Sequence, residues 1–295
     1  MFKNGSIALG HLLVFITILI WSVAFVGNKV LLFYITPIEV MLYRFALAYV
    51  VLLLIYPKIK TFNSIKDEAY FFLIGFLGIF LYFLLENFAL KYTQATNVGL
   101  YMGAIPLFTA IIAHFMLKDE KLNANIITGF TLAMIGMALI LLDGKGFSLR
   151  LKGDILAILA AATFALYSTI LKLAPKGYHF IVITRKSFFY AVVLMLLYHF
   201  ISHKPLHLQA LLLPKVYGNI IFLGLFASSL AFLFYKKGVE IIGSVKSTNY
   251  IYLVPLLTAI TGIIVLNEKL TFKMIIGGTL ILLGLYIAQR KPKLA

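Results

Sequence analysis

The chain has 295 residues, of which 62% are hydrophobic and 12% are charged, and its mean hydropathy is +1.02. Soluble domains carry roughly 25% charged residues, so this composition excludes a water-soluble protein and predicts an integral membrane protein. The sequence contains no cysteine, which excludes disulfides, a thiol nucleophile and cysteine metal sites.

The net charge of +16 could suggest a nucleic-acid partner, but in a membrane protein it more often marks cytoplasmic loops. With the amino terminus inside, the cytoplasmic loops hold about thirteen Lys and Arg residues and the external loops about eight. We therefore expect a multi-pass protein of the cell inner (plasma) membrane with both termini cytoplasmic. Its surroundings are the lipid bilayer, and no nucleic-acid partner is expected.

Ten apolar runs follow one another along the chain, each long enough to cross about 30 Å of hydrocarbon. They lie near residues 8–32, 38–56, 69–90, 95–117, 124–142, 154–174, 179–201, 216–237, 243–266 and 272–289. These runs predict an all-α membrane protein of ten transmembrane helices, five in each half. Asp154 is the expected N-cap of the sixth helix.

The segment 86–120 recurs about 150 residues later in KSTNYIYLVPLLTAITGIIVLNEKL, which begins at residue 246. Repeated positions include the pairs Tyr101 and Tyr250, Pro106 and Pro255, Thr109 and Thr258, Glu120 and Glu268, Gly129 and Gly277, and Gly136 and Gly284. The chain is therefore expected to contain two repeats, residues 1–146 and 147–295. Because each repeat has an odd number of helices, the second must be inverted, and a substrate would bind in a central cavity between them.

Several motifs carry a resemblance to a known family. The chain resembles the EamA family of the drug/metabolite transporter superfamily in four segments. In the first half they are ILIWSVAFVGNKVLL, TPIEVMLYRF and LENFALKYTQATNVGLYMGAIPLFTAIIAHFMLKDEKL, and in the second half SVKSTNYIYLVPLLTAITGIIVLNEKL. The resemblance spans essentially the whole chain. It implies a cavity lined mainly by the first four helices of each half, with the fifth and tenth helices as supports. Members move amino acids, other metabolites or toxic compounds, often outward and in some cases with the proton gradient.

Glu86 is the strongest candidate site residue because a carboxyl group inside an apolar helix costs about 2.5–3.5 kcal/mol to insert and normally faces a cavity. It is a candidate for proton coupling or for binding a substrate amine. A neutral carboxyl that only joins two helices is the alternative. Tyr82 lies one turn earlier on the same face and is a second substrate-binding candidate, although most tyrosines in such chains are packing residues.

The fourth and ninth helices carry further candidates for substrate binding. Asn97 and Tyr101 share one face of the fourth helix, as Lys246, Asn249 and Tyr250 do in the ninth. These groups could line the cavity or only join helices by hydrogen bonds. Pro106 and Pro255 are expected to kink their helices, as hinges or as simple bends.

The remaining polar residues have simpler interpretations. Arg44, Arg185, Lys186 and Lys246 are expected to reach lipid headgroups, with a carboxylate clamp by Arg44 as the alternative. The Glu120 and Glu268 turns are assigned to helix entry and loop pairing, with Asn123 and Thr271 as the N-caps that follow. The spaced glycines of the fifth and tenth helices predict close packing within the chain or in a homodimer, and the sequence does not decide between them.

No enzyme constellation is present: the six histidines show no paired ligand spacing, and no nucleophile or phosphate-binding motif occurs. We therefore expect no catalytic residue, no metal and no cofactor. The predicted function is a secondary transporter of a small-molecule substrate, most simply an exporter of amino acids or related amphipathic compounds. A lipid flippase, a non-transporting membrane scaffold and a carrier of sugar phosphates or nucleotides remain as alternatives.

Overall fold

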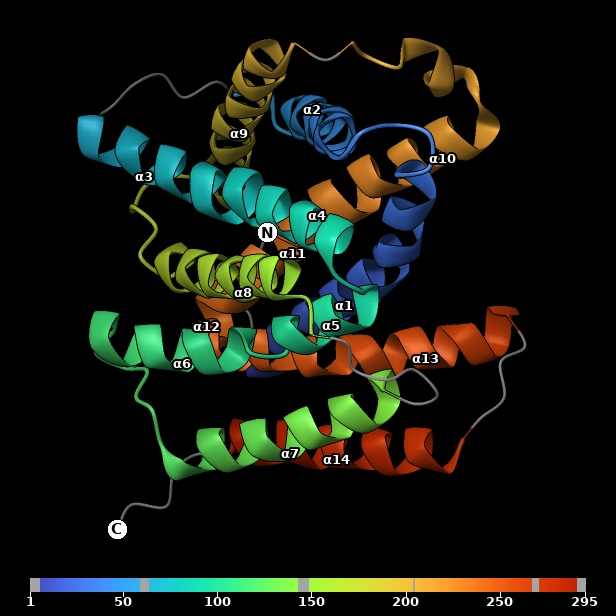
Figure 1. Ribbon diagram of the computed structural model, residues 1–295. Helices are drawn as coiled ribbons and strands as arrows, with labels where there is room; N and C mark the ends of the chain where they lie inside the picture. The colour runs from blue at the N-terminus through green and yellow to red at the C-terminus, as the bar shows by residue number, and fades with distance from the viewer. Residues whose placement is uncertain (1–5, 59–63, 143–148, 204, 267–270, 291–295) are drawn as a thin grey trace.

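The computed structural model describes residues 6–58, 64–142, 149–203, 205–266 and 271–290. All regular secondary structure in these ranges is helical (Figure 1). Nine helices or continuous helical segments of the described residues are long and apolar enough to cross a membrane. The protein is thus an all-α integral membrane protein, as the composition predicted.

The first half begins with two long helices and then a third span built from three consecutive segments. Its elements are α1 (Ile7–Leu31), α2 (Pro37–Ile55), α3 (Ile65–Gly75), the π-helix η1 (Phe76–Leu81), α4 (Tyr82–Tyr92), α5 (Ala95–Met102), α6 (Ile105–Met116) and α7 (Ala124–Leu141).

The second half follows the same order, with two short helices added, one after its second helix and one between α12 and α13. Its elements are α8 (Leu151–Leu171), α9 (Phe180–Ser202), the 3-10 helix η2 (Leu208–Leu212), α10 (Pro214–Phe222), the π-helix η3 (Leu223–Leu230), α11 (Ala231–Ile242), α12 (Ser244–Asn249), the 3-10 helix η4 (Tyr250–Tyr252), α13 (Leu253–Leu266) and α14 (Phe272–Gln289).

The ninth expected span, 243–266, corresponds to α12, η4 and α13, which do not form one regular helix. The number of ten spans therefore stays a prediction.

Both predicted proline kinks coincide with interruptions of the helices. Pro106 lies in the first turn of α6, just after the break that follows Met102, and Pro255 lies in the first turn of α13, just after η4. A proline cannot donate the backbone hydrogen bond that would continue a preceding helix.

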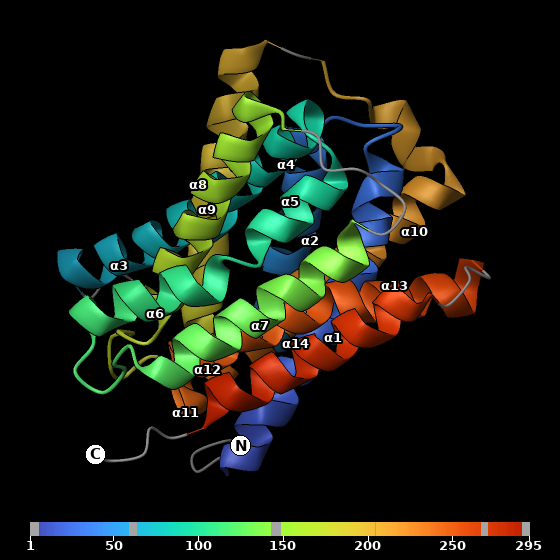
Figure 2. The ribbon, with the colours of Figure 1, turned by 60° about the horizontal axis from the view of Figure 1, so that its bottom comes forward.

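Helices α7 and α14 pack side by side along their lengths at one edge of the molecule (Figures 1 and 2). Their contact uses glycines from both helices. A Cβ atom built on Gly136 would lie 2.5 Å from the Gly277 carbonyl oxygen, and one on Gly129 would lie 2.5 Å from the Gly284 carbonyl oxygen. No side chain fits there, so the glycines allow the two backbones to approach closely within one chain.

Both described ends of the chain lie on one face of the molecule, which we call the terminal face (Figure 2). Gly10, near the start of α1, lies against Ile241 and Ile242 at the end of α11. At the other end of the chain, Gln289 donates a hydrogen bond to the Lys246 carbonyl. The ends of α2, α6, α8 and α11 also lie on the terminal face, because the spans alternate in direction from α1 onward.

Helix ends on both faces are capped by side chains. Asn123 caps α7 by accepting from the Ile126 N–H at 3.1 Å, and Thr271 caps α14 by accepting from the Met274 N–H at 3.2 Å, which confirms the two predicted caps. The prediction for Asp154 was wrong. Helix α8 begins at Leu151, so Asp154 lies in its first turn and accepts a hydrogen bond from the Arg150 N–H.

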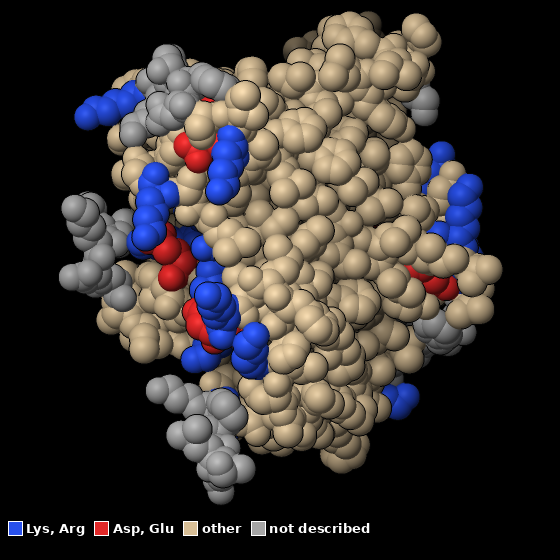
Figure 3. All heavy atoms as spheres, turned by 90° about the vertical axis from the view of Figure 1, so that its left-hand side faces the viewer, with Lys and Arg blue, Asp and Glu red and all other residues tan. Residues whose placement is uncertain are grey.

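Charged side chains gather at two opposite edges of the face in Figure 3 and leave a broad band without Lys, Arg, Asp or Glu between them. Many large apolar side chains of the described residues are exposed on the molecule's outside, including Phe115 at 82% and Tyr286 at 57%. Water would oppose this exposure, whereas lipid tails accept it.

Candidate functional site

A cavity of about 180 Å³ lies inside the bundle between the two halves. It is lined from both halves by Trp21, Ala24, Asn28, Arg44, Tyr82, Phe83, Glu86, Gly99, Met102, Ile105, Met137, Leu141, Phe164, Phe232, Ile251, Val254, Pro255 and Thr258. Most of its wall is apolar, and few polar side chains reach it. This combination is typical of a site for a small organic molecule.

The cavity lies in the half of the molecule away from the terminal face. Asn28 is in the last turn of α1, Leu141 ends α7 and Gly99 is near the start of α5, and all three positions are at the opposite ends of their helices from the terminal face.

Arg44, from α2, is one of two charged residues that line the cavity, and its side chain is 3% exposed. Its Nε donates to the Ser228 Oγ at 2.8 Å, and one Nη donates to the Asn28 Oδ1 at 3.4 Å. Its guanidinium also lies 4.9 Å from the ring centre of Phe45 and 4.8 Å from that of Phe83. The expectation that Arg44 reaches lipid headgroups was therefore wrong, because helix α2 turns this side chain into the bundle.

Glu86, from α4, is the other charged residue of the cavity wall and is 7% exposed. The Tyr82 hydroxyl donates to its Oε1 at 3.0 Å, which reflects their spacing of one helical turn. Among the described residues, neither Glu86 nor Arg44 forms an ion pair. Arg44 and Glu86 thus face one largely apolar cavity, and within the described part of the chain neither has a partner of opposite charge at contact distance.

Aromatic rings form much of the remaining wall. The Trp21 ring lies edge-on to Phe164 and to Phe232, with ring centres 5.9 and 5.5 Å apart. Tyr82 packs against Phe164 at 4.9 Å. Because Trp21 comes from α1, Phe164 from α8 and Phe232 from α11, the wall joins both halves of the chain.

The structure brings only some of the candidate residues together. Glu86 and Tyr82 share the cavity wall, and Pro255 lines it too. Asn97 and Tyr101 of the first half are not among the lining residues, and neither are Asn249 and Tyr250 of the second half. Their roles in substrate binding stay predictions.

The residues outside the wall have other surroundings. Asn97 is buried and donates to the Asp154 Oδ1 at 3.2 Å, which joins α5 to α8. The Tyr250 hydroxyl lies 2.8 Å from the His11 Nδ1, which joins η4 to α1. Asn249 is fully buried, and its side-chain amide has no hydrogen-bond partner in the described part of the chain.

Sequence reasoning missed Asn28 and Trp21 as cavity residues and held a carboxylate clamp by Arg44 only as the alternative. One signal was available for Arg44: it lies in the eighth position of a span of 19 residues, one turn deeper than a typical helix-end cation. Trp21 and Asn28 lie two turns apart on α1, which places them on one face. No group of three or more His, Asp or Glu residues suited to a metal ion occurs within the described residues.

The chain was compared with known protein families. The model of the EamA-like transporter family matches residues 8–142 and 151–289. The curated relatives include an uncharacterized transporter, YyaM, of Bacillus subtilis (strain 168), which is 29% identical over 96% of this chain and 96% of its own. Uncharacterized transporters of Archaeoglobus fulgidus and Clostridium kluyveri are 27% and 24% identical, and the alignments cover 95% and 97% of this chain and 97% and 94% of theirs.

A solved structure, described only as the crystal structure of a protein, has the same fold. Its TM-score is 0.75 at 19% sequence identity, and the match covers 95% of this chain and 96% of the other. The family match extends over both halves and nearly the full length of this chain. The protein is therefore a membrane transporter that belongs to the EamA-like transporter family.

Proposed function

We propose that the protein is a secondary transporter that carries amino acids with apolar side chains, in their zwitterionic form, out of the cell. Transport proceeds by alternating access between two inverted five-helix repeats, residues 1–146 and 147–295. The boundary between these repeats lies outside the described residues.

The observation that carries this proposal is the pair of opposite charges on one cavity wall. Arg44 presents a planar guanidinium, which binds a carboxylate through two parallel hydrogen bonds. Glu86 presents a carboxylate, which binds an ammonium group. An amino acid carries both complementary charges on neighbouring atoms, so it satisfies both residues at once.

The aromatic wall supports an apolar side chain on the substrate. Trp21, Phe164 and Phe232 form a surface with few hydrogen-bonding groups, which would leave the polar part of a sugar phosphate or nucleotide without partners. A single arginine also supplies less positive charge than a phosphate dianion would need.

Glu86 is the candidate for proton coupling. It has no ion-pair partner among the described residues, so one site can hold a proton or a substrate ammonium in turn. The terminal face is taken as cytoplasmic because the expected cytoplasmic loops are richer in Lys and Arg. Export then moves substrate from the terminal face to the opposite face.

The purified protein in liposomes provides the test of this proposal. Uptake of labelled leucine, phenylalanine, glutamate, lysine and a sugar phosphate would be measured with and without an imposed pH gradient. Saturable uptake of the apolar amino acids alone is the expected result. A response to the gradient supports proton coupling, and its absence indicates a facilitator. Selective uptake of the sugar phosphate, or movement only of labelled lipid, would contradict the proposal.

A further inference from the structure

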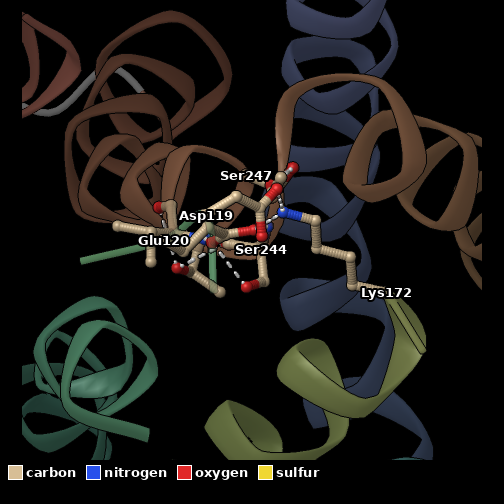
Figure 4. A network of polar contacts seen from close by, with 8 residues as sticks. Asp119, Glu120, Lys172, Ser244 and Ser247 are labelled. Atoms are coloured by element: carbon tan, nitrogen blue, oxygen red, sulfur yellow. Dashed lines mark hydrogen bonds and ion pairs between the residues drawn. The ribbon is translucent and has the colours of Figure 1, made fainter. Parts of the chain in front are cut away.

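A network of charged and polar residues joins three helices on the terminal face (Figure 4). Glu120, which follows α6, accepts hydrogen bonds from the Ser244 N–H at 2.9 Å, the Val245 N–H at 2.7 Å and the Ser244 hydroxyl at 2.7 Å. Lys172, which follows α8, donates to the Glu120 Oε1 and to the Asp119 Oδ2, each at 2.6 Å. The side chain of Glu120 thus holds the start of α12 and the end of α8 together.

The backbone of the α11–α12 connection is shaped to receive this carboxylate. Gly243 adopts φ +89°, in the left-handed region that favours glycine. A Cβ atom on Gly243 would lie 2.6 Å from the Glu120 Oε1. Any other residue at this position would be strained and would also push the carboxylate away. The side chains of Glu120 and Lys172 are only 10% and 21% exposed.

An apolar cluster joins the same ends of α6 and α12 that the network joins. Ala110, Ala113 and Leu117 at the end of α6 pack with Ile126 of α7 and Val245 of α12, and all five are buried. A cleft of about 470 Å³ lies at the same network and is lined by Glu120, Lys172, Gly243 and Lys246 among others. Residues of the network and of the apolar cluster, including Ile126 and Val245, therefore border this cleft together.

The two ends of the bundle differ at corresponding positions. At the terminal face, α6 packs against α12. The repeat places α13 and α5 in the corresponding positions at the opposite face, and no comparable packing between them occurs among the described residues. The structure is thus closed at the terminal face, on the side away from the cavity.

We propose that Glu120 and Lys172 form the gate of the terminal face, and that their contacts to each other and to α12 must break for the cavity to open there. This inference rests on the proposed transport function, because a carrier must expose one site to both faces in turn. The gate consists of two sets of contacts. The ion pair between Lys172 and Glu120 joins the end of α8 to the end of α6, and the hydrogen bonds from α12 to the Glu120 carboxylate join α12 to the end of α6.

A single cysteine reports the opening of this gate, because the chain has none of its own. Ala113→Cys places a thiol in the apolar cluster at a position that is 0% exposed. The purified chain in lipid nanodiscs is treated with a bulky, charged maleimide, and the rate of labelling is measured without any substrate. Glu120→Gln weakens both parts of the gate, and Lys172→Met removes only the ion pair.

We expect labelling of Ala113→Cys to be slow in the parent, and to become roughly tenfold faster or more with Glu120→Gln because several charge-assisted hydrogen bonds are weakened. Lys172→Met should give a smaller increase, since it leaves the hydrogen bonds from α12 to Glu120 in place. Lys237→Met is the matched control, because Lys237 pairs with Glu240 inside α11 and, among the described residues, forms no ion pair with a second helix.

Unchanged labelling in both gate variants would overturn the inference. Fast labelling in the parent would do the same, because the gate would then already be open. Neither result depends on substrate, so the gate is tested separately from the proposed amino-acid transport. Melting temperatures identify a variant that gains labelling by unfolding, and a labelling gain confined to unfolded protein would also overturn the inference.

Discussion

The central cavity and the terminal-face network both hold buried charge, but they place it differently. In the network, Lys172 contacts two carboxylates and Glu120 is further bound by α12. In the cavity, Arg44 is held by neutral Ser228 and Asn28, and Glu86 by the neutral Tyr82 hydroxyl. The ion pairs of Lys172 hold helices together. Arg44 and Glu86 are hydrogen-bonded only to neutral groups, so their charges remain able to bind a ligand.

The packing of the helices also differs between the two faces. Close packing joins α6 to α12 at the terminal face, while the cavity separates the corresponding part of α13 from α5 at the opposite face. A transporter needs such an asymmetry in any single state, because both ends cannot open together.

Replacing Glu86 with Gln should have the largest effect on transport. It removes the charge for the substrate ammonium while keeping the Tyr82 contact nearly isosteric. We expect the ratio of maximal uptake rate to KM to fall by about 10- to 100-fold, as for loss of a charged hydrogen bond of 1.5–3 kcal/mol. Glu240→Gln, at an exposed position on α11, is the control. Equal uptake by Glu86→Gln and the parent would remove Glu86 from the binding site.

Replacing Arg44 with Lys should have a smaller effect than Glu86→Gln. The positive charge stays, but the two parallel hydrogen bonds to a carboxylate are lost. We expect KM for an apolar amino acid to rise by about tenfold with little change in the maximal rate. Kinetics of liposome uptake measure both values. An unchanged KM would show that Arg44 only joins α2 to its neighbours.

Replacing Gly136 with Leu should destabilise the protein without acting on the cavity charges. The new side chain would overlap the Gly277 carbonyl, and α7 and α14 would have to separate. Overpacking of this kind typically costs about 1–3 kcal/mol, so the melting temperature should fall. Thr131→Leu, on the exposed side of α7, is the control. An unchanged melting temperature would contradict the close packing of α7 and α14.

The ion pairs of Lys172 in the network should not change with pH in the neutral range, so this prediction has the smallest expected effect. The hydrogen bond from Lys172 lowers the pKa of Asp119 from 3.8, so this stabilisation is lost only as pH falls through the lowered value. Burial lowers the pKa of Lys172, but its bonds to Asp119 and Glu120 raise it above 10.5 on balance, so this stabilisation is lost only as pH rises through the raised value.

Labelling of Ala113→Cys should therefore stay constant between these limits, once corrected for the reactivity of a free thiol. The measurement is a pH series on the parent and on Lys237→Met. A steep rise in corrected labelling near neutral pH would show that another group controls the gate.

The sequence predicted the membrane class, the order of the spans and the caps at Asn123 and Thr271, because hydrophobic length and capping are local properties of the chain. It also identified Glu86 and Tyr82 as a pair, since one helical turn joins them. It gave the wrong direction for Arg44, because the side of the helix that faces the cavity depends on how α2 packs against η3 and α9.

The role of Glu120 shows the same limit. The turn after α6 predicted helix entry and loop pairing, but the sequence did not name the partners of Glu120. Its contacts with Ser244 and Lys172 span 124 and 52 positions of the chain, so only the folded bundle brings these groups together. Glu268, the repeated position, lies outside the described residues.

Recognition of a zwitterion by Arg44 and Glu86 is the central claim, and competition with substrate analogues tests it most directly. Uptake of labelled phenylalanine would be measured in the presence of each of three unlabelled competitors. Phenylalanine carries both charges, phenethylamine carries only the ammonium, and phenylpropionate carries only the carboxylate. We predict strong competition by phenylalanine alone, and, in residual uptake by Glu86→Gln, competition by phenylpropionate that approaches that of phenylalanine. Equal competition by all three compounds in the parent would contradict the claim, since binding would then depend only on the aromatic ring.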